Sequence, residues 1–274
     1  MGKGFEVVTG FVTAPGATLT AWTLAAGVSL QVKNCPFEAP IWLMQMWGDW
    51  QTAGVLRVTS PRLHDNVQGI RVTGVASEVK PLMASGVKQR LIPQDTLVVA
   101  QSGSATAGDI ESGALLVYYE NLPGIDGRLI TKSDLMKYGG NVVNVENTLA
   151  LGTAGGFSGE EAINAEYDLL KANTDYALVG YVTNVECAVL GWRGPDTGNL
   201  RVAGPGDELE KEITSQWFIW LSEMYGLPCI PVINSANKAS TLIDGVQDEN
   251  GTDVTVNSIL VELSPAANQL FARR

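Results

Sequence analysis

The sequence predicts an all-β protein built as two tandem eight-stranded jelly rolls, which are β-sandwiches, with a few short helices in the loops. Three observations support this fold class. Short runs that alternate in polarity or are rich in β-branched residues recur along the chain. The 30 Gly and 12 Pro residues fall mostly between these runs. Finally, similar short motifs appear in the same order in both halves of the chain.

The strand-like segments are short and evenly spaced, which is typical of sandwiches and barrels and unlike a parallel βαβ sheet. The closing run of the first half is ESGALLVYYENLP at 111–123, and the chain nearly ends with VNSILVELSP at 256–265. The other predicted strands lie at 5–14, 28–34, 54–60, 69–74, 95–101, 176–185, 199–204 and 253–263.

Helix signals are few. The segment at 158–172 is predicted to be a helix, because Ser158 is a suitable N-cap and acidic residues follow in the first turn. The segment at 206–226 begins with a helical pattern after Asp207, but its later part, SQWFIWL, is apolar enough to form a buried strand instead. The segment TKSDLMKYGG at 131–140 predicts one short helix that ends at its Gly pair.

Five pairs of segments suggest a duplicated domain, and their order is the same in both halves. This order predicts an N-terminal jelly roll at 1–122, a connector at 123–140 and a C-terminal jelly roll at 141–274. The two closing runs would then be the last strands of equivalent domains. The pairs are 11–16 with 151–156, 40–56 with 176–190, 70–74 with 200–204, 91–93 with 229–231, and 115–117 with 259–261.

Composition limits the classes of function. The chain carries 18 Lys and Arg against 29 Asp and Glu, a formal net charge of -11, so it repels phosphate backbones and we expect no direct sequence-specific nucleic-acid binding. The N-terminal residues MGKGFE lack a signal-peptide pattern, and no apolar run is long enough for a membrane span. We therefore expect the protein to be made and kept inside a cell.

Tandem jelly rolls joined by a short helical connector resemble the double jelly-roll major capsid proteins of tailless icosahedral viruses, as a compact, phage-like member. The resemblance covers nearly the whole chain and rests on architecture, because this family has no signature motif. It implies a homotrimer of pseudo-hexagonal outline that assembles with neighbouring capsomers and with other virion proteins, such as penton or minor capsid proteins. Many such shells enclose an internal membrane. It also implies synthesis in the host cytoplasm and a final location in the virion capsid.

The residue inventory predicts no catalytic, cofactor-binding or metal-binding residues, and no cofactor. His64 is the single histidine, whereas a metal-binding cupin of the same sandwich shape needs two or three. His64 and Asp65 have the chemistry of a base and its orienting partner, but a polar loop residue is the simpler interpretation. Ser158 lies in GGFSGE, which lacks the spacing of a nucleophile elbow, so we expect it to be an N-cap and the protein not to be an enzyme.

Two further features have alternative interpretations. The acidic residues Asp248, Glu249 and Asp253 surround an Asn-Gly pair; their oxygens suit calcium, but a plain hairpin turn is favoured, since the full calcium-loop pattern is absent. The aromatic residues in 41–50 and 216–221 suit sugar-binding platforms, but core and subunit-interface positions are favoured. We expect part of this aromatic surplus, Trp42 or Trp217, to lie between subunits.

The three cysteines, Cys35, Cys187 and Cys229, are too far apart for a zinc cluster and are predicted to be buried apolar residues. The leading hypothesis from sequence is thus a structural capsid subunit. The alternative is a carbohydrate-binding β-sandwich module, such as a phage adhesin or a lectin-like domain. An enzyme on a β-sandwich scaffold is the least favoured class.

Overall fold

The computed structural model of the chain describes residues 2–36, 38–62, 67–76, 87–152, 154–206, 211–247 and 253–272. Its strands form four antiparallel sheets, so the protein is mostly β as predicted. Six of the predicted strands, at 5–14, 54–60, 69–74, 111–123, 176–185 and 253–263, match observed strands closely.

The described residues of the first half form nine strands. They are β1 (Gly2–Thr13), β2 (Thr20–Ala21), β3 (Thr23–Leu24), β4 (Ile41–Asp49), β5 (Gly54–Thr59), β6 (Ile70–Gly74), β7 (Gln89–Leu91), β8 (Val98–Ser102) and β9 (Ile110–Leu122). One sheet has the order β3-β1-β9-β4-β7, and the other has the order β2-β8-β5-β6. Their facing sides enclose a hydrophobic core that includes Val8, Leu43, Leu56 and Leu115.

In the second half, the part of the chain that the structure describes adds nine strands and six helices. The elements are β10 (Leu129–Ile130), α1 (Lys132–Tyr138), β11 (Gly139–Ala150), β12 (Phe157–Ala162), β13 (Asp175–Thr183), β14 (Cys187–Arg193), η1 (Pro195–Thr197), β15 (Val202–Gly206), α2 (Lys211–Thr214), α3 (Trp217–Tyr225), β16 (Ile230–Asn234), η2 (Ser235–Ser240), β17 (Leu242–Val246), β18 (Asp253–Leu263) and η3 (Pro265–Leu270). The two sheets have the orders β10-β16-β13-β18-β11 and β12-β17-β14-β15.

The two halves have the same strand order. The short strands β2 and β3 follow one another and are counted here as one strand. With this count, eight strands are described in the first half, and β11 to β18 are the eight described in the second. Numbered within each half, one sheet of each half contains the order 1-8-3-6, extended by β3 in the first half and by β10 in the second, and the other sheet has the order 2-7-4-5. Each of the five segment pairs found in the sequence falls on or beside strands that occupy the same position in this order.

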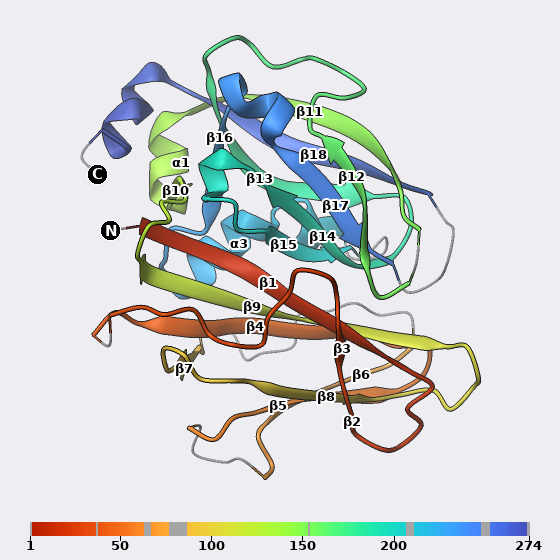
Figure 1. Cartoon of the computed structure of the whole chain (residues 1–274). Coiled ribbons are helices and arrows are strands. Elements are labelled where there is room, and N and C mark those ends of the chain that lie inside the picture. Colours follow the sequence, from red (N-terminus) through yellow and green to blue (C-terminus); the bar gives the residue numbers. More distant parts are fainter. Residues whose placement is uncertain are drawn as a thin grey trace.

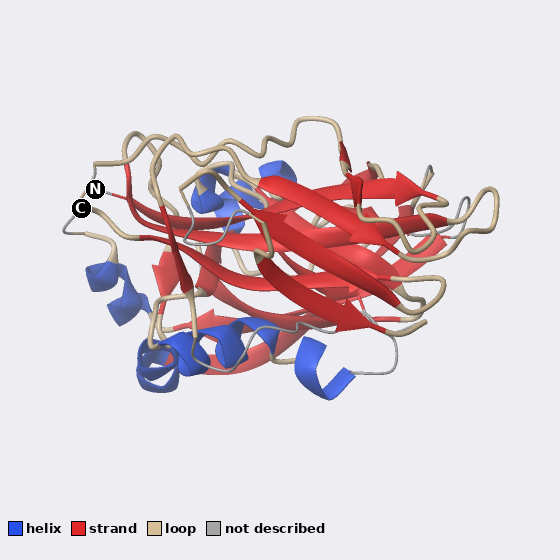
Figure 2. Ribbon diagram, turned by 90° about the horizontal axis from the view of Figure 1, so that it is seen from below, coloured by secondary structure: helices blue, strands red, loops and turns tan. Residues whose placement is uncertain are grey.

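The sheets are stacked in layers (Figure 1). The sheet with β5 and β8 lies at the bottom of that view, and the sheet with β1, β9 and β4 lies above it. β14 and β15 of the second half contact β9, β4 and β1, and the sheet with β11 and β18 lies at the top. Figure 2 shows that most of the long strands run lengthwise through the molecule, with helices mainly at the margins of the sheets.

The predicted helix at 158–172 is wrong. Residues Phe157–Ala162 form β12 instead, which pairs with β17. The Ser158 hydroxyl does not cap a helix but accepts a hydrogen bond from the Gly152 amide, at 2.9 Å. Gly159 has a φ of 71°, which a right-handed helix cannot contain, so pairing with a distant strand overrides the local helix signal.

Two other segments do not form a strand that the sequence suggested for them. The segment 28–34 is not a strand, because only Gln31 forms an isolated bridge, with Thr96. The SQWFIWL segment belongs to helix α3 and not to a buried strand. Its buried residues Trp217, Phe218, Leu221 and Tyr225 recur at a helical spacing, which gives the helix a buried face.

The short helix predicted near the connector is confirmed as α1. Thr131 is its N-cap, and Asp134 completes a capping box, since each side chain accepts a hydrogen bond from the other residue's main-chain amide. The C-cap is Gly139, where β11 begins. The local capping sequence is therefore sufficient to place this helix.

Three glycines surround the buried Trp50 in the first half. A Cβ added to Gly48, Gly54 or Gly74 would overlap the Trp50 indole ring. The indole also donates a hydrogen bond to the Ser102 carbonyl at 3.0 Å, which holds the ring in place. The ring therefore cannot move away easily, and the spacing of these glycines reflects close packing and not turn formation.

Gly74→Ala is expected to lower the free energy of unfolding by about 1–3 kcal/mol, because the new methyl group overpacks a rigid ring. The measurement is urea-induced unfolding followed by tryptophan fluorescence. Gly152→Ala is the matched control, since an added Cβ there meets none of the described atoms within 4 Å. Equal effects of the two substitutions would contradict this account of the Trp50 site.

Candidate functional site

The most extensive candidate site is the contact between the two halves. One core cluster contains residues of both, including Phe5, Trp47 and Tyr118 from the first half and Trp217 and Phe218 from the second. The outward face of the β1-β9-β4 sheet thus packs on β14, β15 and α3. Because this core is continuous, the halves form one packed body.

Two indole rings lie at the centre of this contact. Trp47 on β4 is fully buried and donates its Nε1–H to the Ala188 carbonyl of β14 at 2.8 Å. Trp217 on α3 is also fully buried and donates to the Ala203 carbonyl at 3.0 Å. The two rings meet edge to face, with centroids 5.9 Å apart, a favourable geometry for aromatic pairs.

Polar contacts fix the relative position of the halves around these rings. The Gln45 side-chain amide donates to the Tyr225 hydroxyl at 2.8 Å, and that hydroxyl donates to the Met44 carbonyl. Burial raises the pKa of Tyr225 well above its ordinary value, so it remains a neutral donor. On β1, beyond the short stretch that pairs with β3, the Val7 amide donates to the Arg201 carbonyl at 3.0 Å.

The connector is held by a buried ion network. The Arg128 guanidinium donates to both Asp175 oxygens, at 2.9 and 2.6 Å, and lies 3.5 Å from Asp196. Asn234 donates to Asp175 at 2.6 Å, and the Arg128 guanidinium stacks on the Phe271 ring at 4.1 Å. Burial lowers the pKa of Arg128, but the hydrogen bonds and charges of Asp175 and Asp196 together outweigh it, so the pKa lies above its ordinary value.

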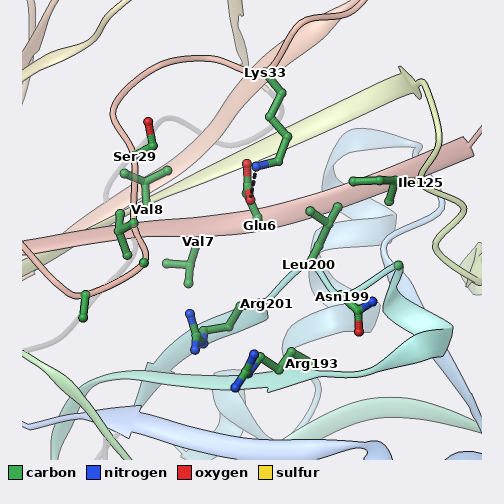
Figure 3. Close-up of a pocket in the computed structure, with 14 residues that line it drawn as sticks. Glu6, Val7, Val8, Ser29, Lys33, Ile125, Arg193, Asn199, Leu200 and Arg201 are labelled. Carbon is green, nitrogen blue, oxygen red and sulfur yellow. Dashed lines mark ion pairs between the residues drawn. The ribbon is translucent and has the colours of Figure 1, made fainter.

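A cavity of about 490 Å³ lies beside the contact between the halves. Figure 3 shows that β1 and Lys33 line it from the first half, while Arg193, Leu200 and Arg201 line it from the second. Glu6 pairs with Lys33 at 2.9 Å. The residues that line the cavity are both charged and apolar.

The two arginines of the cavity already have carboxylate partners. Arg193 pairs with Glu160, and Arg201 makes three short contacts with Asp244, of which the shortest is 2.6 Å. Burial raises the pKa of Asp244 above its ordinary value, although Arg201 acts in the opposite direction. Since these charges are paired within the chain, the cavity does not present the uncompensated positive charge that an anion site uses.

Most of the sequence candidates for chemistry lie outside the part of the chain that the structure describes. His64 lies outside the described residues, as do Asp248 and Glu249 of the acidic turn. Asp253 is exposed at the start of β18. Within the described part of the chain, no three His, Cys, Asp or Glu side chains group in a way that could hold a metal ion.

The cysteines and tryptophans lie mostly inside the molecule. Cys35, Cys187 and Cys229 are buried, as predicted. Trp47, Trp50 and Trp217 are buried as well, whereas Trp42 and Trp220 are only half-buried. Of the two tryptophans considered for a position between subunits, Trp217 is not available, because its ring is already fully enclosed by its own chain, and Trp42 is the one that stays a prediction. The aromatic surplus in SQWFIWL joins the halves of one molecule.

Trp47 and Tyr181 lie in two of the paired segments, 40–56 and 176–190, and have different roles. Both lie in the third strand of their half and are fully buried. Tyr181 packs on Trp192 inside the second half, with centroids 4.8 Å apart, whereas Trp47 crosses to the other half. Phe5 and Tyr225 complete the contact, and no sequence signal distinguished them from ordinary core residues.

Comparisons with known proteins assign no family. No protein-family model matches the chain, and no curated protein matches it. Seven solved chains match, among them the crystal structure of PBSX exported protein XepA, with 9% identity, a TM-score of 0.28, and coverage of 93% of this chain and 86% of that chain. A TM-score this low supports no argument about fold or function. Among the helices described, none is long and apolar enough to cross a membrane.

Proposed function

We propose that each half is an eight-stranded jelly roll, and that the protein is a major capsid protein whose homotrimers build an icosahedral virion shell. The domains in this proposal are 1–122 and 141–274, joined by the connector 123–140. The single observation that carries it is the shared strand order of the two halves, 1-8-3-6 and 2-7-4-5. Alternation of eight antiparallel strands between two sheets in this manner is what a jelly roll requires.

The contact between the halves supports a structural role. A shell subunit must keep its two lobes in a constant relative position, and here a continuous core with two hydrogen-bonded indoles joins them. Three copies of a two-lobed subunit present six similar lobes, which suits a pseudo-hexagonal tile. Partners in this proposal are other copies of the chain and other virion proteins, such as penton or minor capsid proteins. No enzymatic activity is part of it.

The test is the mass of the purified protein in solution, measured by light scattering over a range of concentrations. We expect a stable trimer of three 29.2 kDa chains, followed by shells or hexagonal sheets in electron microscopy. A protein that stays monomeric at high concentration would refute the trimer. Trimers that never form shells or sheets, under any condition of salt or added minor protein, would count against the capsid role.

The alternative function, carbohydrate binding, has weaker support. A sugar platform needs an accessible aromatic face, and Trp42 is the half-buried candidate on β4. However, the Lys88 ammonium lies over its ring, 4.5 Å from the centroid, and Glu120 accepts its Nε1–H at 2.9 Å. A monomeric protein that binds glycans in a titration, with binding lost in Trp42→Ala, would reverse this order of preference.

A further inference from the structure

Three enclosed side-chain oxygens lie on the side of the second half where β11 and β12 contact each other (Figure 1). They are Asn147 Oδ1 on β11, Glu161 Oε2 on β12 and Asn164 Oδ1 in the turn that follows β12. Within the described part of the chain, each is shielded from solvent and has no hydrogen-bond partner. Such buried acceptors are costly, and a native protein normally satisfies them with a donor, a water molecule or an ion.

The orientation of Asn147 is fixed by its own strand and by β12. The residues Val145, Asn147 and Leu149 alternate along β11 and are fully buried, so all three point into the space between the two sheets of this half. The Asn147 Nδ2 donates to the Ala162 carbonyl at 3.1 Å. A carbonyl oxygen only accepts hydrogen bonds, so Nδ2 must face Ala162 and Oδ1 must face away from it.

Glu161 points into the same space. It lies opposite Ile243 on β17, which in turn lies opposite Trp192 on β14. The Trp192 indole donates to the Ser258 hydroxyl of β18 at 3.1 Å, which identifies this side as the one that faces the other sheet. Opposed residues of antiparallel strands point to the same side, so the Glu161 carboxylate also lies between the sheets.

A turn brings Asn164 to the same strand. The Ala165 amide donates at 2.9 Å to the Ala162 carbonyl, the same oxygen that accepts the bond from β11. Farther along, the Glu166 carboxylate accepts a hydrogen bond from the Thr148 amide at 2.5 Å. The segment thus follows β11 closely, and Asn164 lies between these two contacts.

The chemistry of the three oxygens favours a cation. Amide oxygens and an ionised carboxylate are acceptors only, and one water molecule has hydrogens for two of them at most. A cation attracts all three. One carboxylate and two amides form a set of oxygen ligands that suits calcium, whose coordination is flexible. Magnesium demands stricter octahedral geometry, and softer metals prefer Cys or His.

We propose that Asn147, Glu161 and Asn164 bind a calcium ion, with water completing its coordination. The formal net charge of -11 favours uptake of a cation. Only one of the three ligands is a carboxylate, so the site differs from the groups of His, Cys, Asp and Glu that are absent from the described residues. The sequence predicted no metal-binding residues, because amide ligands from separate strands form no motif. The site does not depend on the capsid role.

The ion would join two edge strands. β11 ends the five-stranded sheet of the second half, and β12 ends its four-stranded sheet. One ligand comes from β11, and the other two come from β12 and the turn after it, so the ion fastens the two sheets to each other along an open edge. We therefore expect calcium to raise the unfolding temperature, because the ligands are brought together only in the folded chain.

The test is calorimetric titration of calcium chloride into the full-length protein after treatment with a chelator. We expect one site per chain with a Kd of about 10⁻⁴–10⁻³ M, because affinity falls with the number of charged ligands and this site has one. Magnesium chloride should bind at least about tenfold more weakly. Thermal unfolding with and without excess calcium should show the rise in unfolding temperature.

Two substitutions should change the affinity in opposite directions. Glu161→Gln removes the charge at nearly constant volume and should weaken calcium binding at least about tenfold. It should also abolish the effect of calcium on the unfolding temperature. Asn164→Asp adds a second carboxylate ligand and should tighten binding about tenfold, which a merely structural role for this residue does not predict.

Glu160→Gln is the matched control. It removes the same charge from the neighbouring residue, but Glu160 pairs with Arg193 and does not belong to the site, so the affinity should stay unchanged. Asp253→Asn controls for the acidic turn beside β18 and should also leave the affinity unchanged.

The absence of calcium binding by calorimetry and by thermal unfolding would overturn the site. Binding that is lost in Asp253→Asn and kept in Glu161→Gln would also overturn it, since the ion would then belong to the acidic turn. If Glu161→Gln fails to fold, Asn164→Asp decides, because an affinity equal to that of the unmodified protein contradicts its role as a ligand.

Discussion

Replacing Trp47 by alanine is expected to lower the free energy of unfolding by about 3–5 kcal/mol. The side chain is fully buried at the centre of the contact between the halves. Its loss opens a cavity, removes the edge-to-face contact with Trp217 and leaves the Ala188 carbonyl without its indole donor. Urea-induced unfolding measures the change. We also expect the urea-induced unfolding transition to become broader, because the two halves are then joined less strongly.

Trp42→Ala is the matched control for Trp47→Ala. Trp42 lies on the same strand, but it is only half-buried and its indole donates to Glu120 near the surface. Its truncation should cost about 1 kcal/mol. Trp47→Phe separates packing from hydrogen bonding, since it keeps most of the ring and loses only the donor, at a cost of about 1–3 kcal/mol. If Trp42→Ala and Trp47→Ala had equal effects, the central role of Trp47 would be wrong.

Replacing Arg128 by alanine is expected to cost about 3–5 kcal/mol, as is typical when one partner of a buried ion pair is removed. The Arg128 side chain is 20% exposed, and the Asp175 and Asp196 side chains are 5% and 8% exposed. Without the guanidinium, the two carboxylates lose their shared cation. The connector strand β10 also loses its charged anchor on the second half. Thermal and urea unfolding both measure this effect.

Lys132→Ala is the control for the Arg128 variant. The Lys132–Glu223 ion pair also begins in the connector, but its two side chains are 41% and 63% exposed. We expect its loss to cost at most about 1 kcal/mol, because water screens the pair. Arg128→Lys keeps the charge but not the two-pronged geometry, so it should recover only part of the stability. Full recovery by lysine would show that charge alone is required.

Local sequence determined several elements of this protein. The apolar run at 111–123 is strand β9, which is buried at nearly every position, and the alternating run at 253–263 is strand β18, whose apolar positions match the two-residue period of a strand with one buried face. Helix α1 follows from Thr131 and Asp134, which cap each other three residues apart. The five paired segments could also be found from the sequence, because they depend only on the order of similar motifs along the chain.

Only the tertiary structure decided how these elements are used. Residues Phe157–Ala162 pair with β17 some eighty residues away, and the hydrogen bonds of that sheet outweigh the weak helix preference of the segment. Trp47 and Trp217 look alike as surplus aromatic residues in the sequence, yet stacking of the sheets buries both between the halves. Arg128, Asp175 and Asp196 are far apart along the chain, and only folding brings their charges within contact. Pairing, stacking and ion networks depend on distances across space, which periodicity along a chain does not encode.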